Sequence, residues 1–273
     1  MKKALLLTIL TGFAALPAQG DVLGEPVRTT IEAMRANPDA FHNVKVHFTV
    51  QFASLGRISN PFFTKFTPTE YTNFYGWGDD QPIWREPSYN DVFGMLFVSK
   101  SSPQLEQLYS LPLYRRIRCT GVVRNTFQDI PWVEVLDFRE LRGAVDTPML
   151  THLHRGEKLM EQRLWQRAVS ELSRVPGAGA PAAALRAAEK NLGTCMLRMG
   201  EPAAALGHLA AASRLTQKRD FELENLLATA KQTPGAAIDR IVDATTLRDC
   251  ERPMWEAFEG VRPALQAARP ISR

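Results

Sequence analysis

The chain has 273 residues, of which 45% are hydrophobic and 23% charged, so it holds enough apolar material for one or two globular cores and is not intrinsically disordered. Its formal net charge at pH 7 is +4, and the charge falls to +2 if Lys2 and Lys3 are removed with a targeting signal. So small a charge does not provide the basic field that nucleic-acid binding needs, and we expect no nucleic-acid partner.

The first twenty residues have the pattern of a secretory signal peptide. Residues 1–3 are basic, residues 4–15 are largely apolar, and Ala18 and Gly20 place small residues before Asp21. We therefore expect cleavage after Gly20 and an exported protein, periplasmic or extracellular, that is soluble once the signal is removed. No later run reaches about 18 apolar residues without charge, so we expect no stable membrane insertion.

The region 21–145 is predicted to be a β-domain, because 19 of the 24 aromatic residues lie between Phe41 and Phe138. Apolar and polar residues alternate from Val44 to Phe52, which indicates a strand with one buried face. Further strands are predicted at 92–98, 117–124 and 131–141, and short helices at 27–36 and 104–109.

The order of these elements resembles an oligonucleotide/oligosaccharide-binding (OB) barrel. The resemblance is carried by residues 43–46, which enter the first strand, and by residues 117–123 followed by 130–135. It implies an antiparallel β-barrel in which Gly121 marks a strand bend. The alternative is a small open sheet with helices on one side.

Residues 61–90 depart from strand patterning and are rich in aromatic residues, glycine and acidic residues. Trp77 and Trp84 could form a platform for stacking on a carbohydrate or another envelope polymer. The alternative is that the aromatic side chains fold back and cap one end of the barrel.

The region 146–250 is rich in helix-forming residues and contains two similar segments. The pattern resembles the tetratricopeptide (TPR) helix-turn-helix repeat, with Ala168 and Ala205 at matching positions. The other matching positions are Gly156, Leu159 and Leu172 in the first copy, and Leu192, Gly193, Met196, Leu209 and Ala212 in the second. A third, faint unit is predicted at 221–231 and 234–244, and residues 251–273 are predicted to be a capping helix or tail. The predicted fold class is therefore α+β.

The TPR resemblance implies a concave groove that binds a peptide or protein partner. The positions implied to face it are Glu157, Met160, Glu161, Lys190, Thr194, Leu197 and Arg198. Lys190 and Arg198 could hold a carboxylate of the partner. The alternative is that these are ordinary solvated charges on a helix face.

The sequence gives no positive sign of an enzyme, a cofactor or a metal. His152 and His154 are closely spaced, but residues two apart on a helix point in different directions and cannot share a metal ion. Cys119 is expected in the core, whereas Cys195 and Cys250 lie in different helical segments and could pair. We therefore expect an exported, non-enzymatic interaction or scaffold protein; the carbohydrate-binding or envelope-polymer-binding module is the alternative, and the oligomeric state is open.

Overall fold

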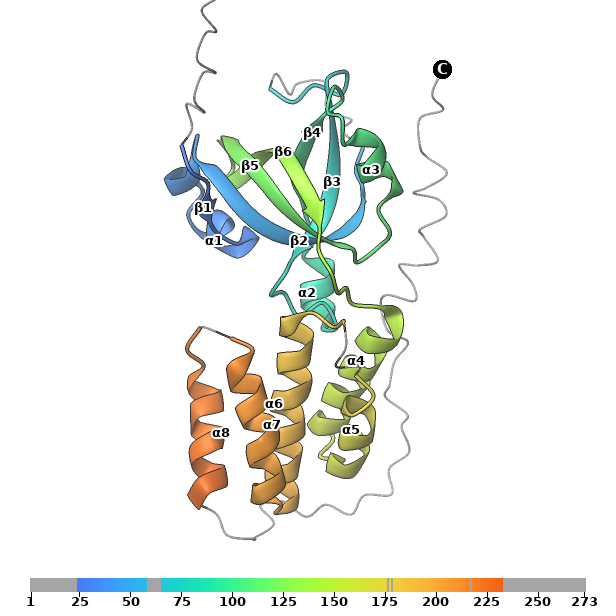
Figure 1. Ribbon diagram of the computed structural model, residues 1–273, viewed down its shortest axis with the longest axis vertical. Helices are drawn as coiled ribbons and strands as arrows, with labels where there is room; N and C mark the ends of the chain where they lie inside the picture. The colour runs from blue at the N-terminus through green and yellow to red at the C-terminus, as the bar shows by residue number, and fades with distance from the viewer. Residues whose placement is uncertain (1–23, 58–64, 176, 178, 217, 233–273) are drawn as a thin grey trace, which may run out of the picture.

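The computed structural model describes residues 24–57, 65–175, 177, 179–216 and 218–232. In these residues a β-barrel is followed by a layer of helices, and the two parts are stacked end to end (Figure 1). The predicted signal peptide, the second helix of the faint third unit, the predicted tail and Cys250 lie outside the described residues.

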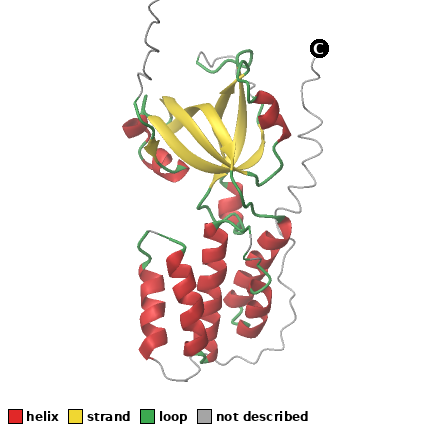
Figure 2. Cartoon of the chain, viewed as in Figure 1, coloured by secondary structure: helices red, strands yellow, loops and turns green. Residues whose placement is uncertain are grey.

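Five strands form a closed barrel (Figure 2). They are β2 (Lys45–Leu55), β3 (Tyr71–Gly78), β4 (Phe93–Ser99), β5 (Arg116–Phe127) and β6 (Ile130–Glu140). The strand order is β2-β3-β4-β6-β5, and β5 pairs with β2 to close the barrel. The β4–β6 pair is parallel, and the other pairs of the barrel are antiparallel. The closed barrel replaces the open sheet that was the alternative.

The alternating residues of β2 explain its place in the barrel. Val46, Phe48 and Val50 are buried in the barrel core, as the two-residue period predicts. Gly121 of β5 lies where the register with β6 shifts. A Cβ on this residue would be 2.7 Å from the carbonyl oxygen of Glu134, so the close approach of the two strands requires glycine.

Two segments before β4 differ from the prediction. Residues 27–36 form a short strand, β1 (Val27–Arg28), and then helix α1 (Ile31–Ala36), which begins where the hydroxyl of Thr30 accepts a hydrogen bond from the Ala33 amide. A 3₁₀ turn, η1 (Pro38–Phe41), follows. Residues 61–90, predicted to be irregular, contain β3 and helix α2 (Glu86–Asn90). In β3 the alternation is hidden because glycine and aromatic residues occupy both faces. Helix α3 (Leu105–Ser110) lies between β4 and β5, as predicted.

Within residues 146–232, as far as they are described, the helical part consists of two antiparallel helix pairs and one further helix (Figure 1). The first pair is α4 (Thr147–Glu161) with α5 (Trp165–Leu172), and the second is α6 (Ala182–Met199) with α7 (Pro202–Arg214). Helix α8 (Phe221–Gln232) packs against α7. The Asp146 side chain caps α4 by accepting from the Met149 amide, and Gly200, with a φ of 83°, ends α6.

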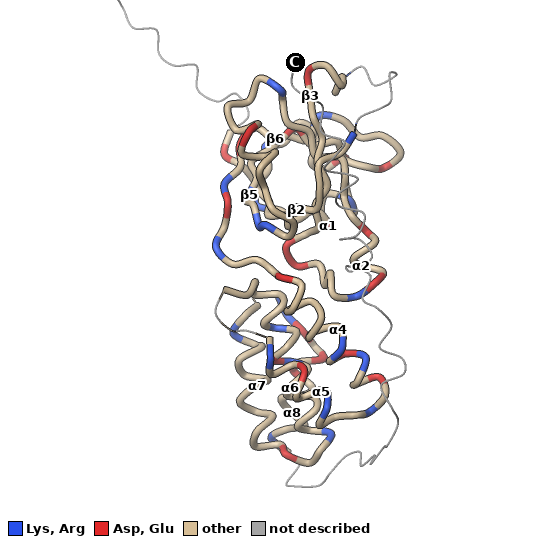
Figure 3. The backbone as a smooth tube through the Cα atoms, turned by 90° about the vertical axis from the view of Figure 1, so that its right-hand side faces the viewer, with Lys and Arg blue, Asp and Glu red and all other residues tan. Residues whose placement is uncertain are grey.

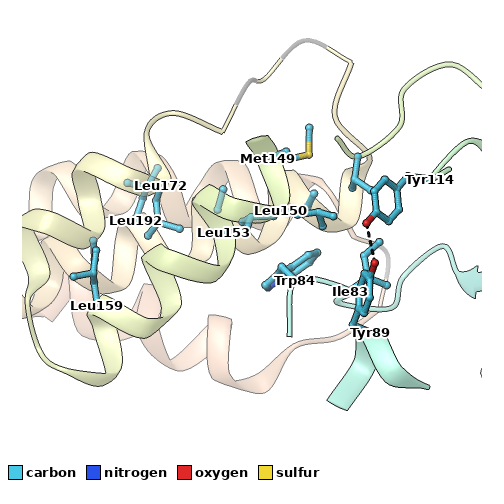
Figure 4. Packing of buried hydrophobic residues seen from close by; sticks show 14 of the residues in the cluster. Ile83, Trp84, Tyr89, Tyr114, Met149, Leu150, Leu153, Leu159, Leu172 and Leu192 are labelled. Carbon is cyan, nitrogen blue, oxygen red and sulfur yellow. Dashed lines mark hydrogen bonds between the residues drawn. The ribbon is translucent and has the colours of Figure 1, made fainter. Parts of the chain in front are cut away.

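Barrel and helices share a hydrophobic core. Ile83, Trp84 and Tyr89 extend from the barrel end and belong to one buried cluster with Leu150 and Leu153 of α4 (Figure 4). All five side chains are buried, with 3% or less of their surface exposed. The two parts are therefore packed together and are not joined by a solvated linker.

Candidate functional site

A groove of about 730 Å³ lies between the two helix pairs and the barrel loop, which comprises residues 79–87 and so includes the first turn of α2. Its helical wall is formed by α4 and α6, the first helix of each pair, together with Trp165 at the start of α5, and its opposite wall by residues 84–87. The TPR resemblance implied a groove lined by helices alone, whereas here the barrel part also supplies lining residues.

Most of the residues predicted for the groove are brought together there. Five of them line it: Glu157, Met160, Glu161, Thr194 and Arg198. They come from two helices that are not consecutive in the chain, so their convergence depends on the packing of the two helix pairs.

Two of the predicted groove residues lie elsewhere. The Lys190 ammonium is held by Asp220 at 3.1 Å and by Glu222 at 2.7 Å, and its side chain is 19% exposed. Leu197 is buried among α6, α7 and α8. The prediction that Lys190 and Arg198 jointly hold a ligand carboxylate is corrected for Lys190, because residues at the start of α8 already neutralise its charge.

Glu157 is the most heavily bonded side chain of the groove. Its carboxylate accepts hydrogen bonds from Trp84 Nε1 at 3.0 Å, from Arg85 Nε at 2.7 Å and Nη2 at 2.9 Å, and from Asn191 Nδ2 at 3.3 Å. The hydrogen bond with Glu157 raises the pKa of the Arg85 guanidinium. Glu157 therefore positions the barrel loop against the helices and has little capacity left for a ligand.

The opposite end of the groove carries an available cation. The Arg198 guanidinium is exposed and lies 6.0 Å from the centre of the Trp165 ring. It makes no ion pair with any of the described residues. One turn earlier on α6, the Thr194 hydroxyl donates a hydrogen bond to the Lys190 carbonyl oxygen at 2.9 Å. A guanidinium resting on an aromatic face is well placed to receive a carboxylate.

The predicted aromatic platform is not exposed. Trp77 is 1% exposed and donates from Nε1 to the carbonyl oxygen of Tyr89 at 2.8 Å, while Trp84 is 3% exposed. Trp77 also packs against the rings of Tyr89 and Tyr114. The expectation that Trp77 and Trp84 offer stacking faces is therefore corrected: both rings fill the core between the barrel and α4.

The closely spaced histidines have separate structural partners. His152 Nδ1 lies 2.8 Å from Glu171 of α5, and His154 Nδ1 lies 3.1 Å from the carbonyl oxygen of Trp84. Within the described part of the chain no group of three or more His, Cys, Asp or Glu side chains could hold a metal ion. None of the helices in that part is long and apolar enough to cross a membrane.

The two described cysteines are buried thiols. Cys119 lies in the barrel core, as predicted, and Cys195 lies among the helices. Burial raises the pKa of both thiols, that of Cys195 to about 12. Neither thiol is activated as a nucleophile.

Basic and acidic residues are interspersed along both parts of the molecule (Figure 3). The sequence predicted no groove position for the other lining residues, which are Trp84, Arg85, Glu86, Pro87, His154, Lys158, Trp165 and Asn191. Arg85 and Glu157 are separated by 72 residues, and no local pattern relates them.

In comparisons with known proteins, no family model and no curated sequence matches the chain.

Proposed function

We propose that this chain is an exported, non-enzymatic interaction protein that binds an extended peptide segment of a protein partner. The observation that carries the proposal is the groove between α4, α6 and the barrel loop, at which five residues predicted from the sequence converge. A volume of about 730 Å³ lies in the range of ligand-binding clefts.

The architecture supports this proposal. The strand order β2-β3-β4-β6-β5 with α3 between β4 and β5 is that expected of an OB-like barrel. In the helices, Gly156 faces Leu172 and Gly193 faces Leu209, which is the close packing expected of TPR-like units. A stack of such units leaves a concave surface, and here the barrel loop closes one end of it.

The groove chemistry favours a partner segment with a carboxylate next to an apolar side chain. Arg198 would pair with the carboxylate, and Met160, a flexible side chain, would adapt to the apolar group. Glu157 keeps the barrel loop in place.

Export rests on the residues at the start of the chain. The basic, apolar and small-residue pattern of residues 1–20 is that of a cleaved secretory signal. Sequencing the N-terminus of the protein recovered from the exported fraction is expected to give Asp21. Recovery of the chain from the cytosol with Met1 retained would contradict export.

The binding proposal is tested by selecting ligands from a library of displayed random peptides and measuring their affinity by fluorescence anisotropy. We expect Arg198→Ala to weaken binding by about tenfold or more, because a charge-assisted hydrogen bond is lost. Arg214→Ala removes the same charge from an exposed position of α7 that does not line the groove, and should leave the affinity within about twofold. Equal effects of the two substitutions would contradict binding in the groove.

A further inference from the structure

A second, smaller hollow lies on the outer face of the barrel and shares no residue with the groove. Its volume is about 250 Å³, and it is formed by β1, β2, β5 and the residue after β1. The polar side chains that line it are those of Arg28, Thr29, His47, Thr49 and Arg118.

The strand register places these side chains together. Arg28 of β1 is the register partner of His47 of β2, and Thr49 of β2 is the partner of Arg118 of β5. Paired residues project to the same side of a sheet, and so do residues two apart on one strand. Arg28, His47, Thr49 and Arg118 therefore share one outward face.

The two arginines of this hollow have no ion-pair partner in the part of the chain that the structure describes. Neither Arg28 nor Arg118 forms an ion pair with any residue in the described ranges, and Arg118 is also the register partner of Arg139 on β6. Like charges in directly opposed positions are destabilising. Five other arginines of the barrel part each pair with a carboxylate: Arg35, Arg85, Arg115, Arg116 and Arg124.

We propose that this hollow binds a phosphate group. Two guanidinium groups can donate paired hydrogen bonds to phosphate oxygens, and the hydroxyl groups of Thr29 and Thr49 add neutral donors. The hollow is smaller than the clefts that hold whole drug-sized ligands, so it suits a single phosphate, either free or at the end of a larger molecule.

The experiment is a titration of the full chain with inorganic phosphate, followed by backbone amide chemical shifts. Saturable shifts are expected at residues 28–29, 47–49 and 118. Arg118→Gln should weaken the affinity by about tenfold. Arg142→Gln is the matched control, because it removes the same charge from an exposed position of the barrel part that neither lines the hollow nor pairs with Arg118. It should change the affinity by less than about threefold.

A second arm of the experiment distinguishes the source of the phosphate. Vesicles of phosphatidylcholine with phosphatidic acid are compared with vesicles of phosphatidylcholine alone, and binding to the former that Arg118→Gln abolishes assigns the phosphate to a lipid. Arg28→Gln, at an exposed position of the two-residue strand β1, repeats the test if Arg118→Gln fails to fold. Absence of saturable binding in both arms, or equal losses in Arg118→Gln and Arg142→Gln, would overturn the proposal.

Discussion

Gly193 of α6 lies against Leu209 of α7 so closely that a Cβ on Gly193 would be 2.5 Å from Leu209 Cγ. The first helix pair repeats this contact, since a Cβ on Gly156 would be 2.6 Å from Leu172 Cγ. In each pair the missing side chain sets the distance between the two helices.

The first prediction concerns this contact. Gly193→Ala should destabilise the protein by about 1 to 3 kcal/mol, because the added methyl group overpacks the helix pair. Gly207→Ala is the control: its Cβ would meet nothing within 4 Å, and alanine in a helix is favoured over glycine by about 1 kcal/mol. Urea unfolding should therefore show opposite shifts for the two variants, and a Gly193→Ala protein as stable as the parent would contradict this packing.

The second prediction uses a histidine–glutamate hydrogen bond whose two residues exchange places between the two helix pairs. His152 on α4 lies 2.8 Å from Glu171 on α5, whereas Glu189 on α6 lies 2.8 Å from His208 on α7. Because the second pair accommodates the exchanged order, the double variant His152→Glu, Glu171→His should recover most of the stability that either single variant loses. The coupling free energy should be about 0.2 to 1 kcal/mol, since the side chains are partly solvated. Thermal unfolding of a double-mutant cycle measures this energy, and additive losses would refute it.

The third prediction concerns the contact between the barrel loop and α4. Glu157→Ala removes the acceptor of four hydrogen bonds donated by Trp84, Arg85 and Asn191, so we expect a loss of about 1 to 3 kcal/mol in the free energy of unfolding. Glu161→Ala, on the same helix, breaks a solvent-exposed ion pair with Lys158 and should cost less than about 1 kcal/mol. Similar losses in denaturant unfolding for both variants would show that Glu157 does not hold the loop.

The fourth prediction concerns pH. Burial alone would raise the pKa of Asp220, but hydrogen bonds from the Leu223 amide and the Lys190 ammonium hold it below its usual value. Since the pKa is lower in the folded than in the unfolded state, the stabilisation is present above about pH 4 and is lost as the pH falls through the folded-state value.

Asp220→Asn should therefore lower stability at pH 7 and weaken the decline in stability between pH 4 and pH 2. Asp129→Asn, at an exposed hairpin turn, should leave both unchanged. Melting temperatures across this pH range give the comparison, and an acid decline in Asp220→Asn as steep as in the parent chain would exclude Asp220 as its source.

Local alternation predicted most strands, and the resemblance to the TPR pattern predicted the helix pairs. The alternation from Val46 to Val50 produced one buried face of β2, and the spacing of Gly156 and Gly193 predicted the positions of close helix contact. In β3, by contrast, a Cβ on Gly76 would be 3.1 Å from the Gln51 carbonyl oxygen of the neighbouring strand, so this position favours glycine. The glycine beside Trp77 disrupts the alternation of apolar and polar residues that would indicate a strand.

The site was less accessible to sequence reasoning because its contacts join distant segments. Lys190 lies on the first helix of its pair, as expected, but Asp220, 30 residues away, neutralises it. Nor does the local sequence indicate that Trp84 packs into the core with α4, since an aromatic residue in a Gly- and Pro-rich segment fits an exposed platform equally well. Both outcomes depend on which surfaces the folded chain brings together.

The central claim is that the barrel loop and the two helix pairs form one peptide-binding groove. Amide hydrogen exchange of the full chain, with and without a peptide selected from the random library, tests it most directly. We expect peptide-dependent protection at residues 84–86 of the barrel loop, at 157–161 of α4 and at 191–198 of α6, with the strands β2 and β5 unchanged. Protection confined to the barrel strands, or to α7 and α8, would contradict the claim.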